Sequence, residues 1–402
     1  MSAGRSGAHG DPAAPDPRPA VEPGPGLRSD VLAQGELDTA PSWLRRRRVP
    51  LAVGAALIAA TAALYQALSG HSADAAARYT HVKPIWTGDA DAAAAPAVEH
   101  GTLYLPAADG HLYGLDAATG TARWVSDATA GPGHTLATPV FGYGMLYTSD
   151  GDRTLYAVDA SDGSTRWEFA TGGPVRTTPA VLGETLYAGS SDGRVYALDA
   201  LTGEPLWSQP IGSTGYPTAA PGTTLYVTAE SGRVYALDTS TGRQKWVFDA
   251  GTPISAPPTV VSDLVYVGGN DRTVRALDAH TGSVTWTFTG GSAFTARPAV
   301  ADGLLFEGGR DGTLYALDAV TGTPRWHRAT GGAVAAAATP TDYGTLVVGS
   351  GDHRVRALDA RTGSVAWTYA GGDDAGQPPV VSDDVLYLIG ADHRLVALRQ
   401  TR

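Results

Sequence analysis

Residues 196–207 read Tyr-Ala-Leu-Asp-Ala-Leu-Thr-Gly-Glu-Pro-Leu-Trp, and this phrase decides the fold because the chain repeats it seven times. An apolar strand ends in Asp, a turn with Gly follows, and the next strand carries a Trp eight residues after the Asp. The pairs are Asp116 with Trp124, Asp159 with Trp167, Asp199 with Trp207, Asp238 with Trp246, Asp278 with Trp286, Asp318 with Trp326 and Asp359 with Trp367. Successive copies lie 39 to 43 residues apart. A fixed period near 40, with several short strands in each repeat, is typical of a β-propeller.

One full repeat predicts a four-stranded blade. Strand-forming runs cover residues 256–261, 264–267, 273–278 and 283–288, and turn residues separate them. We name these strands A to D in chain order. The Gly of the C–D turn permits a positive φ, and the Asp before it can accept backbone N–H bonds across the turn. We expect each Trp to dock between blades; the docking residues are Trp86, Trp124, Trp167, Trp207, Trp246, Trp286, Trp326 and Trp367.

The two ends of the repeat region hold incomplete copies that complete each other. Residues 395–399 align with strand C, but Arg399 holds the Asp position and no Trp follows. Residues 82–86 supply Trp86 and have no Asp strand before them. The N-terminal strand is therefore predicted to close the last blade, which removes the open edges of the ring. We predict an all-β fold over residues 81–402, an eight-bladed β-propeller of four-stranded blades.

The repeated pattern Ala-x-Asp-x-x-Thr-Gly-x-x-x-Trp resembles the tryptophan-docking motif of the pyrroloquinoline quinone (PQQ) repeat propellers. The resemblance covers nearly all of residues 81–402. That family includes quinoprotein dehydrogenases and also cofactor-free propellers, among them the eight-bladed lipoprotein of the outer-membrane β-barrel assembly machinery. The resemblance implies the propeller fold, and by itself it is compatible with either an enzyme or a scaffold.

Several departures from the dehydrogenase pattern argue against catalysis. The dehydrogenases carry vicinal cysteines, a Ca²⁺ site and long insertions, whereas this chain has no Cys, a single Asn at position 270 and uniform repeat spacing. We therefore expect a non-catalytic scaffold that binds proteins and uses no cofactor or metal. The alternatives are a PQQ-dependent oxidoreductase, which would need PQQ with Ca²⁺, and a sensor of small ligands.

The first eighty residues have a different composition. Residues 1–44 are rich in Pro, Gly and Ala and predict a disordered tail. Four Arg at 45–48 precede a stretch without charge at 49–70, and a linker follows at 71–80. A single membrane span through residues 49–69 is predicted, with the N-terminus cytoplasmic and the propeller extracytoplasmic. The alternative is secretion after cleavage near Ala75.

Composition bounds the class of partner. The formal net charge is −11, which makes nucleic acid an unsuitable ligand. The chain has only two Lys residues and many Arg, Ala and Gly residues. This composition indicates a bacterial genome of high GC content. We expect protein partners on the cell-envelope side of the membrane.

Strand order predicts where such partners bind. In a four-stranded blade the B–C turns and the D–A connections share one face, and here their sequences vary, as expected of a binding surface. The candidate residues are His134, Arg176, Tyr216, Glu230, Phe294, Arg297, Arg310, His353, Asp373, Asp374 and His393. The alternative is that these polar side chains are merely solvated. His353 and His393 are expected on neighbouring blades, where they could contribute to a metal site, and Asp373-Asp374 could act as a general base or bind Ca²⁺.

Overall fold

The computed structural model describes residues 81–130, 135–220, 222–372, 377–390 and 392–401, all within the compact unit His71–Arg402. The predicted tail, anchor and linker of residues 1–80 lie outside the described residues, as do His134, Asp373 and Asp374. Among the residues that are described, no helix is long and apolar enough to cross a membrane.

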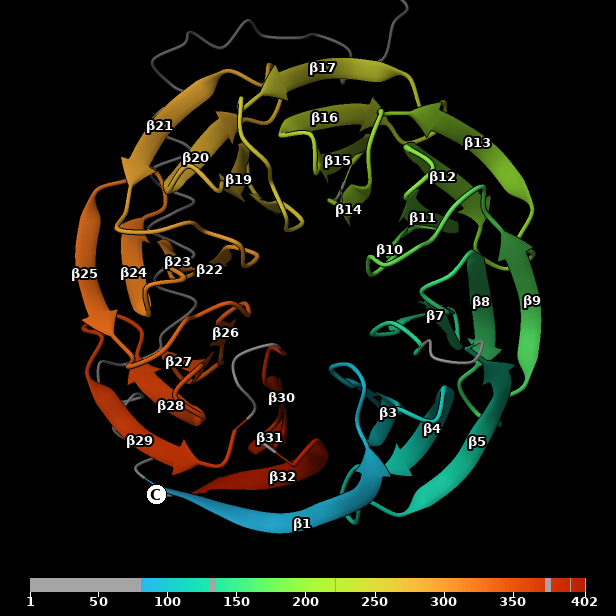
Figure 1. Ribbon diagram of the computed structural model, residues 1–402, viewed down its shortest axis with the longest axis horizontal. Helices are drawn as coiled ribbons and strands as arrows, with labels where there is room; N and C mark the ends of the chain where they lie inside the picture. Colours follow the sequence, from blue (N-terminus) through green and yellow to red (C-terminus); the bar gives the residue numbers. More distant parts are fainter. Residues whose placement is uncertain (1–80, 131–134, 221, 373–376, 391, 402) are drawn as a thin grey trace, which may run out of the picture. The chain divides into compact units, whose positions relative to one another are not determined.

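The described residues form eight four-stranded antiparallel sheets arranged as a ring, as predicted (Figure 1). Within each sheet, strand A lies nearest the centre and strand D forms the outer rim (Figure 1). Blades 1 to 4 are β2 (Ala97–Glu99), β3 (Thr102–Pro106), β4 (His111–Asp116) and β5 (Ala122–Thr129); β6 (Val140–Gly142), β7 (Met145–Ser149), β8 (Thr154–Asp159) and β9 (Thr165–Ala170); β10 (Ala180–Leu182), β11 (Thr185–Ser190), β12 (Arg194–Asp199) and β13 (Pro205–Pro210); β14 (Gly215–Ala219), β15 (Thr224–Ala229), β16 (Arg233–Asp238) and β17 (Gln244–Asp249). Blades 5 to 8 are β18 (Thr259–Val261), β19 (Leu264–Gly268), β20 (Thr273–Asp278) and β21 (Val284–Thr289); β22 (Ala299–Ala301), β23 (Leu304–Gly308), β24 (Thr313–Asp318) and β25 (Pro324–Ala329); β26 (Thr339–Pro340), β27 (Thr345–Ser350), β28 (Arg354–Asp359) and β29 (Val365–Ala370); β30 (Val380–Ser382), β31 (Val385–Ile389), β32 (Arg394–Thr401) and β1 (His81–Asp91).

The ring closes through the first strand of the described chain. Strand β1 pairs antiparallel with β32, with His81 opposite Thr401 and Trp86 opposite Ala397. The sheet order is β1-β32-β31-β30, so the N-terminal strand is the outer strand of blade 8. This confirms the closure predicted from the two incomplete copies of the repeat.

Burial explains the residue pattern of the strands. Strand β7 is buried at every position, because both faces of strand B are covered by neighbouring blades. Strand β9 on the outer rim alternates between half-buried and exposed positions, with Trp167 and Phe169 on the half-buried side. The core is therefore a series of layers between blades, such as the cluster of Tyr187, Val195 and Leu225.

Each Trp of strand D docks on the following blade. In seven junctions the indole Nε1 donates to the backbone carbonyl of the residue after the repeated Asp, at 2.9 to 3.2 Å. A Tyr of strand B donates its hydroxyl to the same carbonyl in five junctions; these are Tyr147, Tyr187, Tyr226, Tyr266 and Tyr387. This second donor was not anticipated from the sequence, although Tyr recurs as the third residue of strand B in these repeats.

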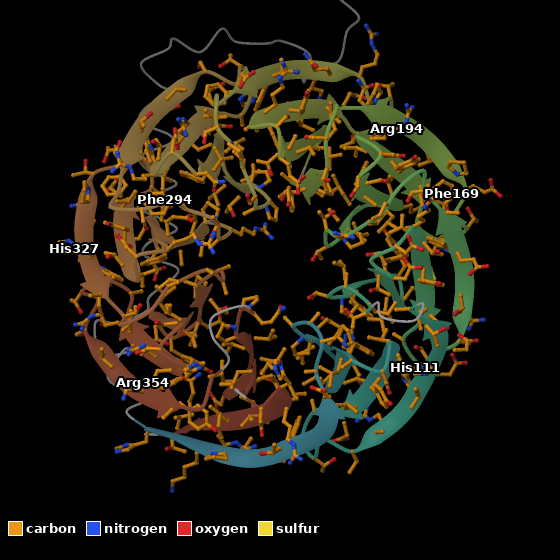
Figure 2. All side chains as sticks on the ribbon, viewed as in Figure 1. His111, Phe169, Arg194, Phe294, His327 and Arg354 are labelled. Carbon is orange, nitrogen blue, oxygen red and sulfur yellow. The ribbon has the colours of Figure 1, made fainter. Side chains whose placement is uncertain are left out.

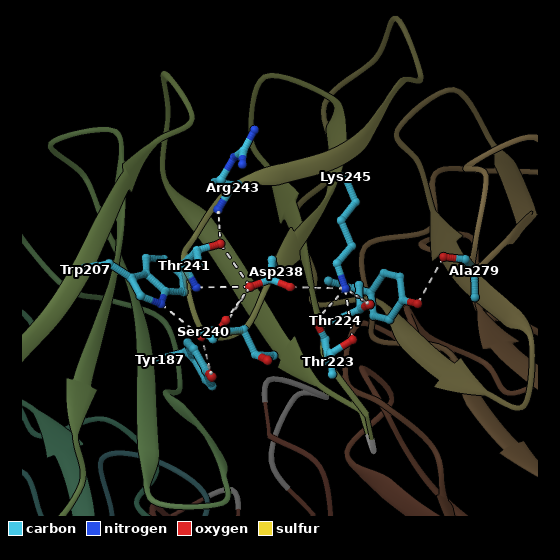
Figure 3. A network of polar contacts seen from close by, with 12 residues as sticks. Tyr187, Trp207, Thr223, Thr224, Asp238, Ser240, Thr241, Arg243, Lys245 and Ala279 are labelled. Atoms are coloured by element: carbon cyan, nitrogen blue, oxygen red, sulfur yellow. Dashed lines mark hydrogen bonds and ion pairs between the residues drawn. The ribbon is translucent and has the colours of Figure 1, made fainter. Parts of the chain in front are cut away.

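The Asp of the motif organises the turn that receives the Trp. Asp238 Oδ1 accepts the backbone N–H groups of Ser240 at 3.2 Å and Thr241 at 3.1 Å, and Lys245 Nζ lies 3.6 Å from Oδ2 (Figure 3). Hydrogen bonds from the hydroxyls of Ser240 and Thr241 lower the pKa of Asp238 to about 2. The carboxylate therefore stays ionised at neutral pH and keeps the turn bonded.

The Gly of the C–D turn leaves room for the Trp of the preceding blade. Gly242 has a φ of +69°, and a Cβ atom at this position would lie 2.6 Å from the ring of Trp207. We expect Gly242→Ala to lower the free energy of unfolding by about 2–5 kcal/mol, because backbone strain and overpacking act together. Urea unfolding measures the change. Gly251→Ala is the matched control, since Gly251 has a φ of +68° with nothing within 4 Å of such a Cβ. If the two variants lose equal stability, contact between Trp207 and the turn contributes nothing.

Candidate binding face

Backbone contacts place the connections on two opposite faces. The N–H of Ala117 in a C–D turn donates to Gly101 O in the neighbouring A–B turn, at 3.1 Å. The N–H of Thr171 at the end of strand D donates to Arg153 O in a B–C turn, at 2.8 Å. The B–C turns and D–A connections therefore share one face, which we call the candidate binding face.

Most of the described candidate residues reach solvent. Side chains exposed on this face are Arg176, Glu230, Arg297, Arg310, His353 and His393. Tyr216 is half-buried, and its hydroxyl donates to Glu230 Oε1 at 3.0 Å. Burial, together with the nearby Glu230 carboxylate, raises the pKa of Tyr216 to about 12. This Tyr is therefore a neutral hydrogen-bond donor that holds the Glu230 side chain at the B–C turn of blade 4.

The structure corrects the assignment of Phe294 to this face. Its side chain is 0% exposed and packs between blades 5 and 6, against Tyr315 at a ring-centroid distance of 5.7 Å (Figure 2). An apolar residue fills the same place, five residues before strand A, in three other connections; these are Val175, Ile254 and Val334. The recurrence was visible in the sequence and marks a core position, so Phe294 is not available to a partner.

Arg297 has a mixed environment. The residue as a whole is exposed, and its Nε donates to Thr259 Oγ1 of the preceding blade at 3.2 Å. The surrounding protein desolvates the group and lowers its pKa, although a guanidinium remains charged at neutral pH. Thr259 in turn donates to Pro298 O at 2.5 Å, so Arg297 is held where two inner strands meet.

The two candidate His residues are placed by turn geometry. His353 and His393 have φ values of 59° and 61°, in the left-handed slot of the B–C turn that Gly193 and Gly232 fill in other blades. Across the described ranges, no group of three or more His, Asp or Glu side chains could hold a metal ion.

Several Asp residues of the B–C turns are bonded to their own blade, which sequence reasoning missed. Asp109 accepts the hydroxyl of Tyr113 at 2.6 Å, and Asp352 forms an ion pair with Arg356. The Arg356 guanidinium lowers the pKa of Asp352. The signal was a Tyr or Arg four residues after the Asp, a spacing that places both side chains at the same end of the sheet.

This geometry defines the class of protein: an eight-bladed β-propeller built from tryptophan-docking repeats. The model of the family described as outer membrane protein assembly factor BamB matches residues 76–141, 131–214, 194–293 and 286–402. The chain therefore belongs to this family. A search of curated protein sequences found no match.

Two solved structures share the fold. The computationally designed Ika8 protein superposes with a TM-score of 0.72 at 18% identity, covering 79% of this chain and 99% of that chain. BamB from Moraxella catarrhalis superposes with a TM-score of 0.55 at 19% identity, covering 65% of this chain and 96% of that chain. At this identity the two likenesses establish the fold alone.

Proposed function

We propose that this chain is a non-catalytic scaffold that binds other proteins of the bacterial cell envelope through its candidate binding face. The observation that carries the proposal is the contrast between the two faces. The C–D turns repeat one structural device in every complete blade, whereas the opposite face, apart from the recurring Asp of the B–C turns, presents different polar side chains from blade to blade. Membership of a family described as an assembly factor supports the same conclusion.

The chemistry of this face suits protein recognition. Arg176, Arg297 and Arg310 are exposed cationic groups, and the Tyr216–Glu230 pair adds a fixed hydrogen-bonding group. Arg and Tyr are the side chains that most often dominate protein interfaces. A partner surface that carries acidic side chains would fit such a set.

We also propose that residues 49–69 anchor the protein in the membrane, with the propeller on the extracytoplasmic side. Strand β1 starts at His81, opposite Thr401 at the end of strand C, so the chain enters the ring on the face of the C–D turns. His81, the first described residue, therefore lies on the face opposite to the candidate binding face. Alkaline extraction of membranes tests the proposed anchor, because an anchored protein should stay in the membrane pellet, whereas a cleaved and secreted propeller would appear in the soluble fraction.

The binding proposal predicts a face-specific effect. A photo-crosslinking amino acid at position 176 or 310 should capture specific envelope proteins in cells, whereas the same group at exposed position 204 or 361 near the C–D turns should not. Arg297→Ala with Arg310→Ala should weaken the captured complex at least tenfold, because Arg is enriched among the interface residues whose truncation costs about 2 kcal/mol or more. Equal capture from both faces would contradict the proposal.

An enzymatic function is tested on the same full-length protein. Equilibrium dialysis against PQQ with Ca²⁺ should show no stoichiometric uptake if the chain is a scaffold. Metal-dependent uptake, with turnover of a redox dye, would instead support the quinoprotein alternative and overturn the scaffold assignment. Binding of another small molecule without turnover would favour the sensor.

A further inference from the structure

An ionisable residue occupies a core position of strand B in blade 6. Glu307 lies in β23, two residues after Leu305, which packs in the layer between blades 5 and 6. Side chains two residues apart in a strand share a face, so Glu307 faces the preceding blade. The same position in the other blades holds apolar residues or Thr, all buried; these are Leu105, Thr148, Ala188, Val227, Val267, Val348 and Leu388. Thr148 satisfies its hydroxyl on Ala137 O at 2.7 Å.

Glu307 has no comparable partner. Its side chain is 1% exposed, and within the described part of the chain neither carboxyl oxygen has a hydrogen-bond partner. A Cβ atom on Gly268 would lie 3.2 Å from Glu307 Oε1, 2.9 Å from the Cβ of Phe294 and 3.2 Å from the Phe294 carbonyl oxygen. This part of the wall therefore presents an apolar side chain and a carbonyl oxygen, neither of which donates a hydrogen bond. An ionised carboxylate in such a wall is strongly unfavourable, and the neutral acid costs far less.

The groups around Glu307 supply no compensating charge. From blade 5, Tyr266, Val274 and Ala276 face this layer, and the Tyr266 hydroxyl is bonded to Ala319 O at 3.1 Å. Tyr315 lies directly opposite Glu307 in the ladder of β23 and β24, and its hydroxyl accepts the N–H of Gly291 at 3.0 Å. The connection that carries Phe294 also bears Arg297, whose guanidinium bonds Thr259 instead. Burial raises the pKa of Glu307 well above its usual range.

We propose that Glu307 is a proton-binding site in the wall between blades 5 and 6, occupied in the folded ring at neutral pH, so that folding takes up a proton. The sign of the linkage follows. In the unfolded chain a Glu releases its proton at about pH 4.3, whereas in the ring it keeps the proton to higher pH. The contribution of protonated Glu307 to the stability of the ring is therefore complete below the pKa of the unfolded chain. This contribution is lost as the pH rises toward the pKa of the folded ring.

The test compares the folding constant of the full-length wild type with that of Glu307→Val across pH 5 to 9. Val is suited to the site because Val267 and Val348 fill the equivalent position in neighbouring blades. Over each pH unit between the two pKa values, the wild-type constant should fall about tenfold relative to the variant. Glu307→Gln should follow the Val variant in slope, and the exposed Glu168→Gln should follow the wild type. Parallel profiles for wild type and Glu307→Val would overturn the proposal.

Two further readouts locate the proton. At pH 7 the infrared spectrum of the wild type should contain the carbonyl stretch of a protonated carboxylic acid that is absent from Glu307→Gln; its absence from both spectra would overturn the proposal.

Hydrogen exchange tests the wall itself. The Phe294 amide, bonded to Gly269 O at 3.1 Å, should lose protection with rising pH in the wild type only. The Val334 amide, bonded to Gly309 O at 3.1 Å between blades 6 and 7, is the internal control.

Discussion

Deletion of residues 81–91 is expected to cause the largest loss of stability of any local change in this protein. The deletion removes β1, which forms the outer strand of blade 8, and exposes the edge of β32 from Arg394 to Thr401. It also removes Trp86, which donates to Ala117 O at 3.2 Å and contacts Tyr387. Loss of one buried Trp already costs about 3–5 kcal/mol, so loss of the whole strand should lower the free energy of unfolding by more than about 5 kcal/mol. We therefore expect the deletion variant to show no cooperative melting transition above physiological temperature.

A peptide of residues 81–91 supplies the control for this deletion. If the strand acts only by pairing and docking, the peptide added in trans should restore the melting transition in proportion to its concentration. A peptide with Trp86 replaced by Ala should restore less. A deletion variant that melts like the wild type would show that closure of blade 8 contributes little to the ring.

The second large effect is expected for Trp246→Ala, with a loss of about 3–5 kcal/mol in the free energy of unfolding. Trp246 is 8% exposed, its indole donates to Ala279 O at 2.9 Å, and its ring lies against the turn at Gly282. The next residue on the same strand, Val247, is 45% exposed, and Val247→Ala should change stability by less than about 0.5 kcal/mol. Denaturant unfolding of both variants measures the difference, and similar losses would mean that Trp246 does not dock blades.

The junction between blades 7 and 8 refines this prediction. Within the described residues the Trp367 Nε1 finds no acceptor, and the side-chain amide of the buried Gln400 is also unpaired. Replacement by Phe should therefore cost about 1 kcal/mol more at Trp246 than at Trp367, because only the former loses a hydrogen bond.

Particular residues show why the fold was accessible from the sequence. The Asp–Trp spacing identified strands C and D in every complete blade, and Arg399 and Trp86 together indicated the shared blade. These signals are local: a turn needs Gly at one position, and a strand alternates its faces with a period of two residues. The ring then follows because each blade can bury its faces only against another blade.

The candidate binding face was less accessible for a physical reason. Phe294 has a polar neighbourhood in the sequence, and packing between blades 5 and 6 shows that the recurring apolar position it fills belongs to the core. The ion pair between Asp352 and Arg356 likewise depends on the turn geometry that brings the two groups together within one blade.

The sequence alone determined the all-β class, the number of blades and the way the ring closes, because each depends on short-range spacing that recurs with a fixed period. Tertiary structure alone decided which side chains are exposed to solvent and which are buried. Burial depends on the neighbouring blade, which lies about 40 residues away in the chain. Glu307 is the clearest case: its strand position resembles that of Val267 in every local respect, and only the wall around it turns an ordinary carboxyl group into a buried, neutral one.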